Sequence, residues 1–120
     1  MDLNLKRVYE QPSSKDGVRI LVDRLWPRGL SKEKVKIDHW MKNISPSSEL
    51  RNWYNHDPKK WNEFKERYFS ELNSNIDMLN SLIEVVKNNK STLVYSSKEE
   101  KFNNAVALKE FLAKHLAKNN

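Results

Sequence analysis

Apolar residues recur along the chain with two periods, and the period predicts which element each segment forms. Residues 18–25 and 92–95 are rich in β-branched and aliphatic residues and are predicted to be strands. The first of them has an uninterrupted apolar centre, which is typical of a strand covered on both faces of a sheet. The alternation over residues 5–10 predicts a third strand. The segment 37–44 fits either a strand or a helix, and we favour the strand.

Four other segments have the three- and four-residue spacing of amphipathic helices. The clearest one starts at Asp57, a good N-cap, with Pro58 as the first helical residue. Its predicted buried stripe consists of Trp61, Phe64, Tyr68 and Leu72. The remaining helices are predicted over residues 47–54, 76–87 and 103–117, and a single helical turn over residues 32–34.

The order of these elements is strand, strand, strand, helices, strand, helix. This order predicts an α/β fold with a mostly parallel sheet of about four strands and flanking helices. The chain has 120 residues, which is the usual size of one domain, and it shows no internal repeat and no interior linker. We therefore expect a single domain over residues 1–120.

Polar and charged side chains follow the predicted strands at the points where they end. In an open parallel sheet, ligands bind beyond the carboxyl ends of the strands. The end of the second strand carries Asp23, Arg24, Trp26 and Arg28, and residues 45–48 follow the third. The last strand is followed by Ser96 and Ser97, and then by Asn103 and Asn104 at a predicted helix start. The parallel sheet would bring all these groups to one edge.

These residues suggest an anion-binding pocket with a division of roles. The guanidinium groups of Arg24 and Arg28 would supply charge, and Trp26 would form a wall. Free N–H groups at a helix start favour negative charge, so Ser96, Ser97, Asn103 and Asn104 would orient the anion. Asp23 and His56 are the candidates for acid–base catalysis.

Several of these residues can also serve only the fold, and the sequence does not decide between the structural and the ligand-binding interpretation. Arg24 can pair with a carboxylate of the fold, and Arg28 can be a solvated loop residue. Asn103 or Asn104 can be an ordinary helix cap. The indole of Trp26 can be part of the core.

Composition excludes several kinds of chemistry. The chain has no cysteine, which rules out disulfides, thiolate nucleophiles and Cys-ligated zinc. His39 and His115 stand alone, and no two histidines have metal-ligand spacing. With two glycines, the chain has neither a dinucleotide-binding nor a P-loop motif, and it has no G-x-S-x-G elbow. We expect no metal and no cofactor.

The net charge of +6 permits binding to nucleic acid or to a small anion. Lysines and acidic residues alternate along the chain, however, which favours a mixed-sign surface over a nucleic-acid-binding stripe. We therefore expect a small anionic ligand and no sequence-specific nucleic acid. The sequence shows no signal peptide and no apolar run long enough to span a membrane, so we expect a cytoplasmic protein. The oligomeric state is left open.

Three strings resemble, in this order, the YeaO-like branch of the domain-of-unknown-function 488 family: LVDRLWPRGLSKE, ISPSSELRNWYNHDPKKWNEF and TLVYSSKEEKFNNAVALKEFL. The resemblance extends from about Leu5 to Leu112. Members of this family have no established activity. Some are labelled transcriptional regulators, but this chain shows no helix-turn-helix pattern.

The wider family has two motifs that are similar to parts of this chain. Its first motif is a strand ending in Asp-Val-Arg with a nearby proline, similar to Asp23, Arg24 and Pro27. Its second motif has a cysteine and a His-Arg pair in a polar loop, where this chain has Ser96-Ser97 and Asn103-Asn104. The resemblance thus implies the fold and the place of the site, and it implies that no thiol-dependent reaction occurs here.

The sequence predicts an α/β protein that binds a small anionic or phosphate-bearing ligand at the carboxyl edge of its sheet. It does not decide whether acid–base catalysis by Asp23 and His56 follows binding. The alternative is a regulatory or nucleic-acid-binding module without catalysis.

Overall fold

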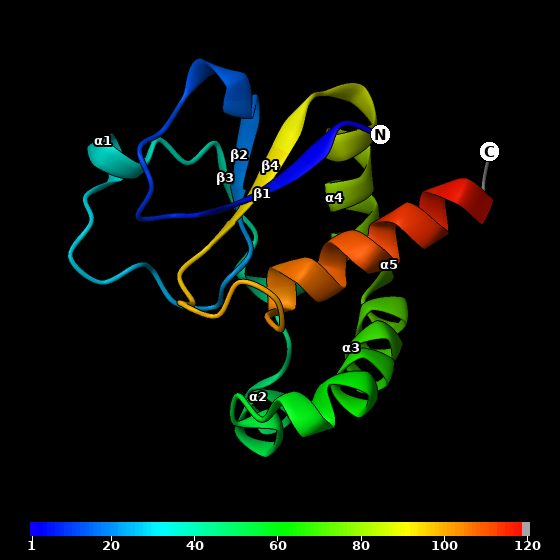
Figure 1. The fold of residues 1–120 in the computed structure, drawn as a ribbon. Helices are drawn as coiled ribbons and strands as arrows, with labels where there is room; N and C mark the ends of the chain where they lie inside the picture. The colour runs from blue at the N-terminus through cyan, green and yellow to red at the C-terminus, as the bar shows by residue number, and fades with distance from the viewer. Residues whose placement is uncertain (119–120) are drawn as a thin grey trace.

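A four-stranded parallel sheet forms the centre of the protein, as the computed structural model shows (Figure 1). The structure describes residues 1–118. The strands are β1 (Leu3–Arg7), β2 (Val18–Leu21), β3 (His39–Trp40) and β4 (Ser91–Tyr95). Their order across the sheet is β1-β4-β2-β3. All three neighbouring pairs are parallel, so the four carboxyl ends lie at one edge and the predicted α/β fold is confirmed.

Helices surround this sheet on both sides. The α-helices are α1 (Lys32–Val35), α2 (Ser48–Tyr54), α3 (Trp61–Ser74), α4 (Ile76–Asn88) and α5 (Asn104–Lys118). Three short 3₁₀ turns complete the fold: η1 (Ser14–Asp16), η2 (Lys42–Ile44) and η3 (Pro58–Lys60). Figure 1 shows α3, α4 and α5 on one side of the sheet and α1 on the other, while α2 lies beyond the carboxyl ends of the strands.

Strand β2 is covered on both faces. Its successive residues Ile20 and Leu21, and Val22 directly after it, are all fully buried. Because side chains alternate along a strand, Ile20 and Val22 join one apolar cluster and Leu21 joins another. The first cluster contains the buried side chains of α3, α4 and α5, and the second contains Val8, Val35 and Val94. This burial confirms the prediction made from the uninterrupted apolar run.

Two predicted strands are shorter than the sequence indicated. The prediction of a strand over 37–44 was largely wrong, because only His39 and Trp40 pair with β2. After a last bond from Met41 N to Leu21 O (2.9 Å), the chain turns into η2. The strand predicted over 18–25 ends at Leu21, although Val22 N still donates to Val94 O (3.2 Å). From Asp23 onward, the chain leaves the sheet and forms the edge loop.

The first strand is shifted toward the N-terminus relative to the prediction of residues 5–10. It ends at Arg7, whose backbone N–H donates to the Glu10 carboxylate (2.9 Å). Glu10 N donates back to Arg7 O (3.1 Å), and this pair of bonds turns the chain. The turn places Tyr9 at the edge of the sheet instead of inside a strand.

The stripe of α3 lies in the first apolar cluster almost as its spacing predicts, and α3 packs mainly against α2, α4 and α5. Phe64, Tyr68 and Leu72 are buried, while Trp61 is half-buried. The Tyr68 hydroxyl donates to Ile44 O (2.7 Å), which satisfies the polar tip of a fully buried ring. Asp57 caps the turn η3 through its bond from Lys59 N (3.0 Å), so α3 itself begins four residues later than its cap. No helix within residues 1–118 is long and apolar enough to cross a membrane.

Candidate functional site

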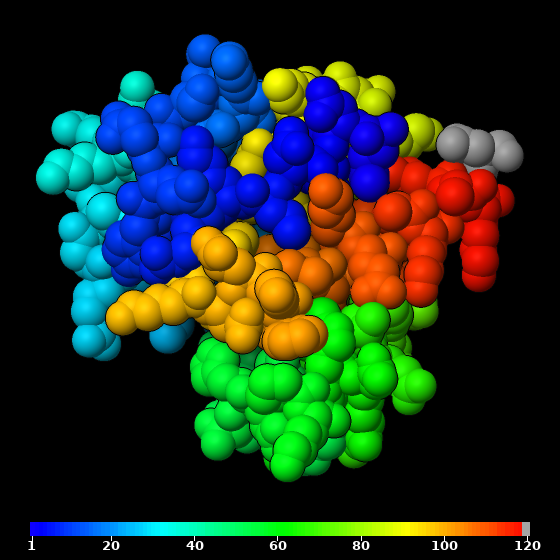
Figure 2. Space-filling model, viewed as in Figure 1, coloured from blue at the N-terminus to red at the C-terminus, as the bar shows by residue number. Residues whose placement is uncertain are grey.

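A cavity of about 620 Å³ opens at the carboxyl edge of the sheet. This volume lies within the range of roughly 300–1,000 Å³ that is usual for ligand pockets. In Figure 2 the outline of the molecule is notched between α2 (green) and the loop after β2 (light blue), beside the orange segment after β4. All nine residues singled out from the sequence line the cavity: Asp23, Arg24, Trp26, Arg28, His56, Ser96, Ser97, Asn103 and Asn104.

Asp23 joins three elements that are far apart in sequence. Its carboxylate accepts hydrogen bonds from Ser96 N (2.8 Å), Ser96 Oγ (2.7 Å) and Asn104 Nδ2 (3.2 Å). Its backbone oxygen accepts a bond from Trp40 Nε1 (2.8 Å). Hydrogen bonds to a charged acceptor are stronger than neutral ones. Asp23 therefore holds the end of β2, the end of β4 and the start of α5 together.

Arg24 lies beside this junction without a carboxylate partner among the described residues. Its Nη2 donates to Pro46 O at 3.3 Å, and its buried Nε has no hydrogen-bond partner in the described part of the chain. A buried N–H without a partner costs on the order of 1–3 kcal/mol. The fold thus leaves part of the hydrogen-bonding capacity of this guanidinium unused.

Arg28 is exposed at the rim of the cavity. Its backbone oxygen accepts a bond from the Tyr9 hydroxyl (3.0 Å), which ties the loop after β2 to the turn after β1. Its guanidinium makes no hydrogen bond or ion pair with residues 1–118. Gly29 follows with φ +81°, a conformation that glycine adopts without strain.

Trp26 belongs to the core and to the cavity lining at once. Its Nε1 donates to Leu30 O (2.7 Å), and its ring meets Trp40 edge-on at 5.4 Å between centroids. The half-buried ring also packs against the second apolar cluster, which includes Leu21 and Val94. These contacts hold the indole in one orientation at the cavity wall.

The segment after β4 is held by its own hydrogen bonds. Asn103 caps α5, since its Oδ1 accepts a bond from Val106 N (3.0 Å) while its Nδ2 donates to Glu99 O (2.7 Å). The backbone oxygens of Ser96 and Ser97 accept bonds from the guanidinium of Arg7 (3.2 and 2.9 Å). These contacts correspond to the structural interpretation of this segment. Its predicted role in orienting an anion stays a prediction.

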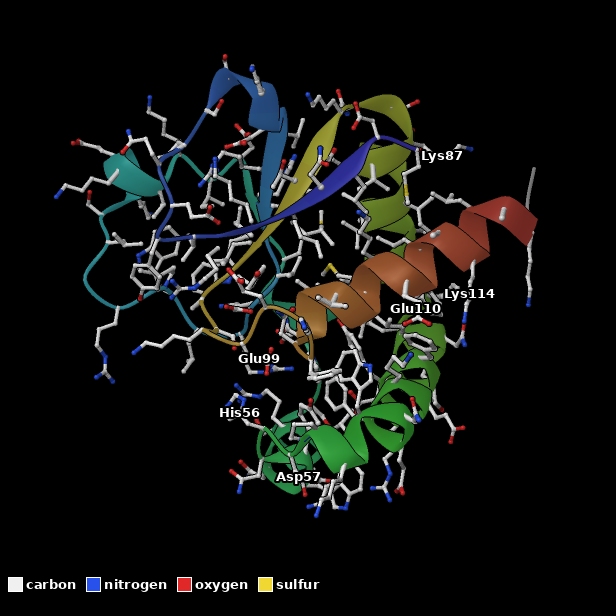
Figure 3. The ribbon with its side chains drawn as sticks, viewed as in Figure 1. His56, Asp57, Lys87, Glu99, Glu110 and Lys114 are labelled. Carbon is white, nitrogen blue, oxygen red and sulfur yellow. The ribbon has the colours of Figure 1, made fainter. Side chains whose placement is uncertain are left out.

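The end of α2 forms the opposite wall. Asn55 and His56 both have left-handed backbone conformations, with φ 45° and 55°, and they turn the chain from α2 into η3. The His56 ring is exposed and forms no hydrogen bond within residues 1–118. In Figure 3 it lies with Asp57 at the end of α2, below the segment that carries Glu99.

Tyr54 connects this wall to the segment after β4. Its hydroxyl donates to Phe102 O (2.9 Å), and its buried ring stacks on Phe64 with the centroids 4.3 Å apart. Burial raises the pKa of this hydroxyl, and the carboxylates of Glu99 and Asp57 raise it further. The phenol therefore stays protonated and keeps its role as a donor.

Sequence reasoning missed several lining residues, namely Tyr9, Arg51, Asn52, Asn55 and Phe102. Tyr9 follows the first strand, whose end was predicted too late. The others lie on α2 or ahead of α5, where the search for strand ends did not reach. Arg51 and Asn52 lie on α2, whereas Asn55 follows its last residue in a left-handed conformation, so helical spacing gave no signal that joins them.

Positive charge exceeds negative charge around the cavity. Three arginines line it, Arg24, Arg28 and Arg51, against the single carboxylate of Asp23. Arg51 makes only a long bond to Ser48 Oγ (3.5 Å). Residues 1–118 contain no group of three or more His, Cys, Asp or Glu that could hold a metal ion. The lining suits an anion better than a cation.

Comparison with known proteins identifies the family. A family model described as the inactive DUF488-N3 subclade matches residues 2–120. YeaO of Escherichia coli K12, an uncharacterized protein, is 39% identical over 112 residues, which cover 93% of this chain and 97% of YeaO. The uncharacterized protein Rv3073c of Mycobacterium tuberculosis H37Rv is 46% identical over 70 residues, covering 58% of this chain and 59% of that protein. No solved structure matches. The family predicted from the three sequence strings is thereby confirmed, and the chain belongs to the domain-of-unknown-function 488 family.

Proposed function

We propose that the protein binds a small anionic or phosphate-bearing ligand in the cavity at the carboxyl edge of its sheet, without catalysing a reaction on it. One observation carries this proposal: Arg24, Arg28 and Arg51 line the same cavity, and none of them pairs with a carboxylate within residues 1–118. Guanidinium groups match phosphate and carboxylate oxygens two at a time. An anion between them would gain charge-assisted bonds from more than one side.

The hydrogen bonding of Arg24 supports this assignment further. Buried N–H groups seldom lack partners in native structures, and where the buried Nη2 of Arg19 lacks one, the carboxylate of Asp16 still neutralises that guanidinium. Arg24 gives one long bond to Pro46 O and leaves Nε without a partner among the described residues. A bound anion would compensate this guanidinium.

Three observations favour binding over catalysis. The Asp23 carboxylate already accepts three hydrogen bonds, which suits a structural clamp better than a base that must exchange a proton. His56 has no partner within residues 1–118 that would orient its ring, as a catalytic base requires. The matching subclade is also described as inactive. A cytoplasmic location, expected from the sequence, stays a prediction.

Isothermal titration with inorganic phosphate and with sulfate tests the proposal. Arg28→Ala should lower the affinity by about tenfold to a hundredfold, because a charge-assisted hydrogen bond is worth roughly 1.5–3 kcal/mol. Arg28→Lys should weaken binding by less, since lysine keeps the charge and loses the fork. The melting temperature without ligand should not change, because the side chain is exposed and makes no contact to lose.

The matched control is Lys87→Ala. Lys87 is exposed on α4, away from the end of α2 and from Glu99 (Figure 3). This variant removes the same charge from the protein as Arg28→Ala, so it should bind phosphate as the wild type does. Equal affinity of the Arg28→Ala variant and the wild type would refute the assignment of the site.

A further inference from the structure

We infer that the ligand of the cavity is a phosphomonoester that carries an apolar ring, rather than a free inorganic anion. This inference rests on the proposed function and narrows its ligand class. The cavity of about 620 Å³ is far larger than a phosphate ion, so a phosphate bound by the arginines would leave most of it to another group.

Exposed apolar surface gathers at this cavity. The described residues include five large apolar side chains that are exposed, and two of them, Leu25 (70%) and Tyr9 (44%), line the cavity. A third, Trp40, contacts the lining residue Trp26. A concentration of exposed apolar residues at one place on a monomer marks a binding surface.

Aromatic rings from several segments line the cavity, and contacts hold three of them in place: Tyr9, Trp26 and Phe102. Trp26 is held by the bond from its Nε1 to Leu30 O. Tyr9 is held by its bond to Arg28 O, and the guanidinium of Arg7 lies 5.2 Å from the centre of its ring. Phe102 packs edge-on against Trp61 at 5.5 Å.

Rings that are already ordered lose little conformational entropy when a ligand binds. Aromatic pairs in offset or edge-on contact also gain stability beyond what the buried area alone supplies. The apolar part of the ligand is therefore assigned as a ring, next to a phosphate held by the arginines.

The test is a set of titrations of the full chain with three probes: inorganic phosphate, butyl phosphate and phenyl phosphate. Phenyl phosphate should bind at least about tenfold more tightly than inorganic phosphate, a difference of about 1.4 kcal/mol. It should also bind more tightly than butyl phosphate, which offers an alkyl chain instead of a ring. The comparison with butyl phosphate separates ring recognition from general apolar burial.

A pair of variants locates the apolar contact. Leu25→Ser should reduce the advantage of phenyl phosphate over inorganic phosphate and leave the affinity for inorganic phosphate unchanged. The matched control is Ile76→Ser, which removes an exposed apolar side chain (51%) from the start of α4, outside the cavity lining. The control should keep the full advantage of the aryl ester.

The outcomes separate this inference from the proposal beneath it. Equal affinity for inorganic and phenyl phosphate would overturn the inference and leave the anion site standing. Equal affinity for phenyl and butyl phosphate would overturn the assignment of a ring. If the Leu25→Ser variant still prefers phenyl phosphate over inorganic phosphate as strongly as the wild type does, the assignment of Leu25 to the contact with the ring would be overturned. Absence of binding by all three probes would overturn the proposed function itself.

Discussion

Replacing Asp16 with asparagine should destabilise the protein and should do so less as the pH falls. Asp16 is buried at the amino end of β2, away from the cavity. Its carboxylate accepts bonds from Arg19 Nη1 (2.7 Å), Lys6 Nζ (3.2 Å) and Ser13 N (2.9 Å). Arg19 is only 3% exposed, so Asp16→Asn would leave a buried cation without its counter-charge.

The size of the effect follows from this burial. Removing one partner of a buried ion pair costs roughly 3–5 kcal/mol. Asparagine keeps an oxygen that Arg19 can still donate to, so the loss should fall near the lower end, about 3 kcal/mol. With a typical urea dependence of roughly 1–3 kcal/mol per M, the unfolding midpoint should move down by about 1–3 M.

The pH dependence has a definite sign. Burial by itself would raise the pKa of the Asp16 carboxyl, but the hydrogen bonds from Ser13, Lys6 and Arg19 outweigh it and hold the pKa below its ordinary value of 3.8. A group whose folded pKa is lowered stabilises the protein above its unfolded pKa, and this contribution is lost as the pH falls through the folded pKa. The difference in the free energy of unfolding between wild type and variant (the stability gap) should thus be largest near pH 7 and should shrink below about pH 4.

Urea titrations of both proteins at pH 7, 5 and 3, followed by circular dichroism, measure this gap. The reasoning would be refuted by a gap below about 1 kcal/mol at pH 7, which is the range of an exposed pair. A gap that stays constant from pH 7 to pH 3 would refute the assignment to the ionised carboxylate.

Two further predictions concern α3 and nucleic acid. Trp61→Ala should lower the free energy of unfolding by about 2–4 kcal/mol in a urea titration, which is less than the loss of a fully buried ring, because Trp61 is half-buried against Phe64 and Phe102. A loss near zero would show that its ring contacts contribute nothing. The protein should bind duplex DNA weakly at low salt from its net charge of +6 and without sequence preference, so a complex specific for one sequence at physiological salt in a gel-shift assay would contradict the mixed-sign surface.

The sequence carried information about the fold where one physical effect dominated. The apolar run around Ile20 and Leu21 predicted a doubly covered strand because burial on both faces leaves no other pattern. The strand predicted over 37–44 was largely wrong because the spacing of this segment satisfies both the strand and the helix period. Only two of its residues, His39 and Trp40, pair with β2. The periodicity of a segment does not show where its hydrogen bonding to a neighbouring strand ends.

The site could be located more readily than it could be described. Counting from strand ends found Asp23, Arg24 and Ser96 because a parallel sheet brings these ends to one edge. The bonds from Ser96 and Asn104 to Asp23 could not be predicted, since they depend on rotamers set by packing. Arg51 was missed because it reaches the cavity from α2, whose position beyond the sheet is set by tertiary contacts.

The alternation of β2 between two apolar clusters restricts how this chain can change in length. A deletion of one residue in β2 would move Leu21 onto the face that holds Ile20, because side chains alternate with a period of two. The same shift would draw Asp23 away from Ser96 and Asn104 and would open the junction beside the cavity. A substitution in β2 changes the packing of one side chain in one cluster. An insertion or deletion there would disrupt both clusters and the candidate site together. Changes in length should therefore be tolerated less between Val18 and Asp23 than in exposed segments that lie outside the sheet.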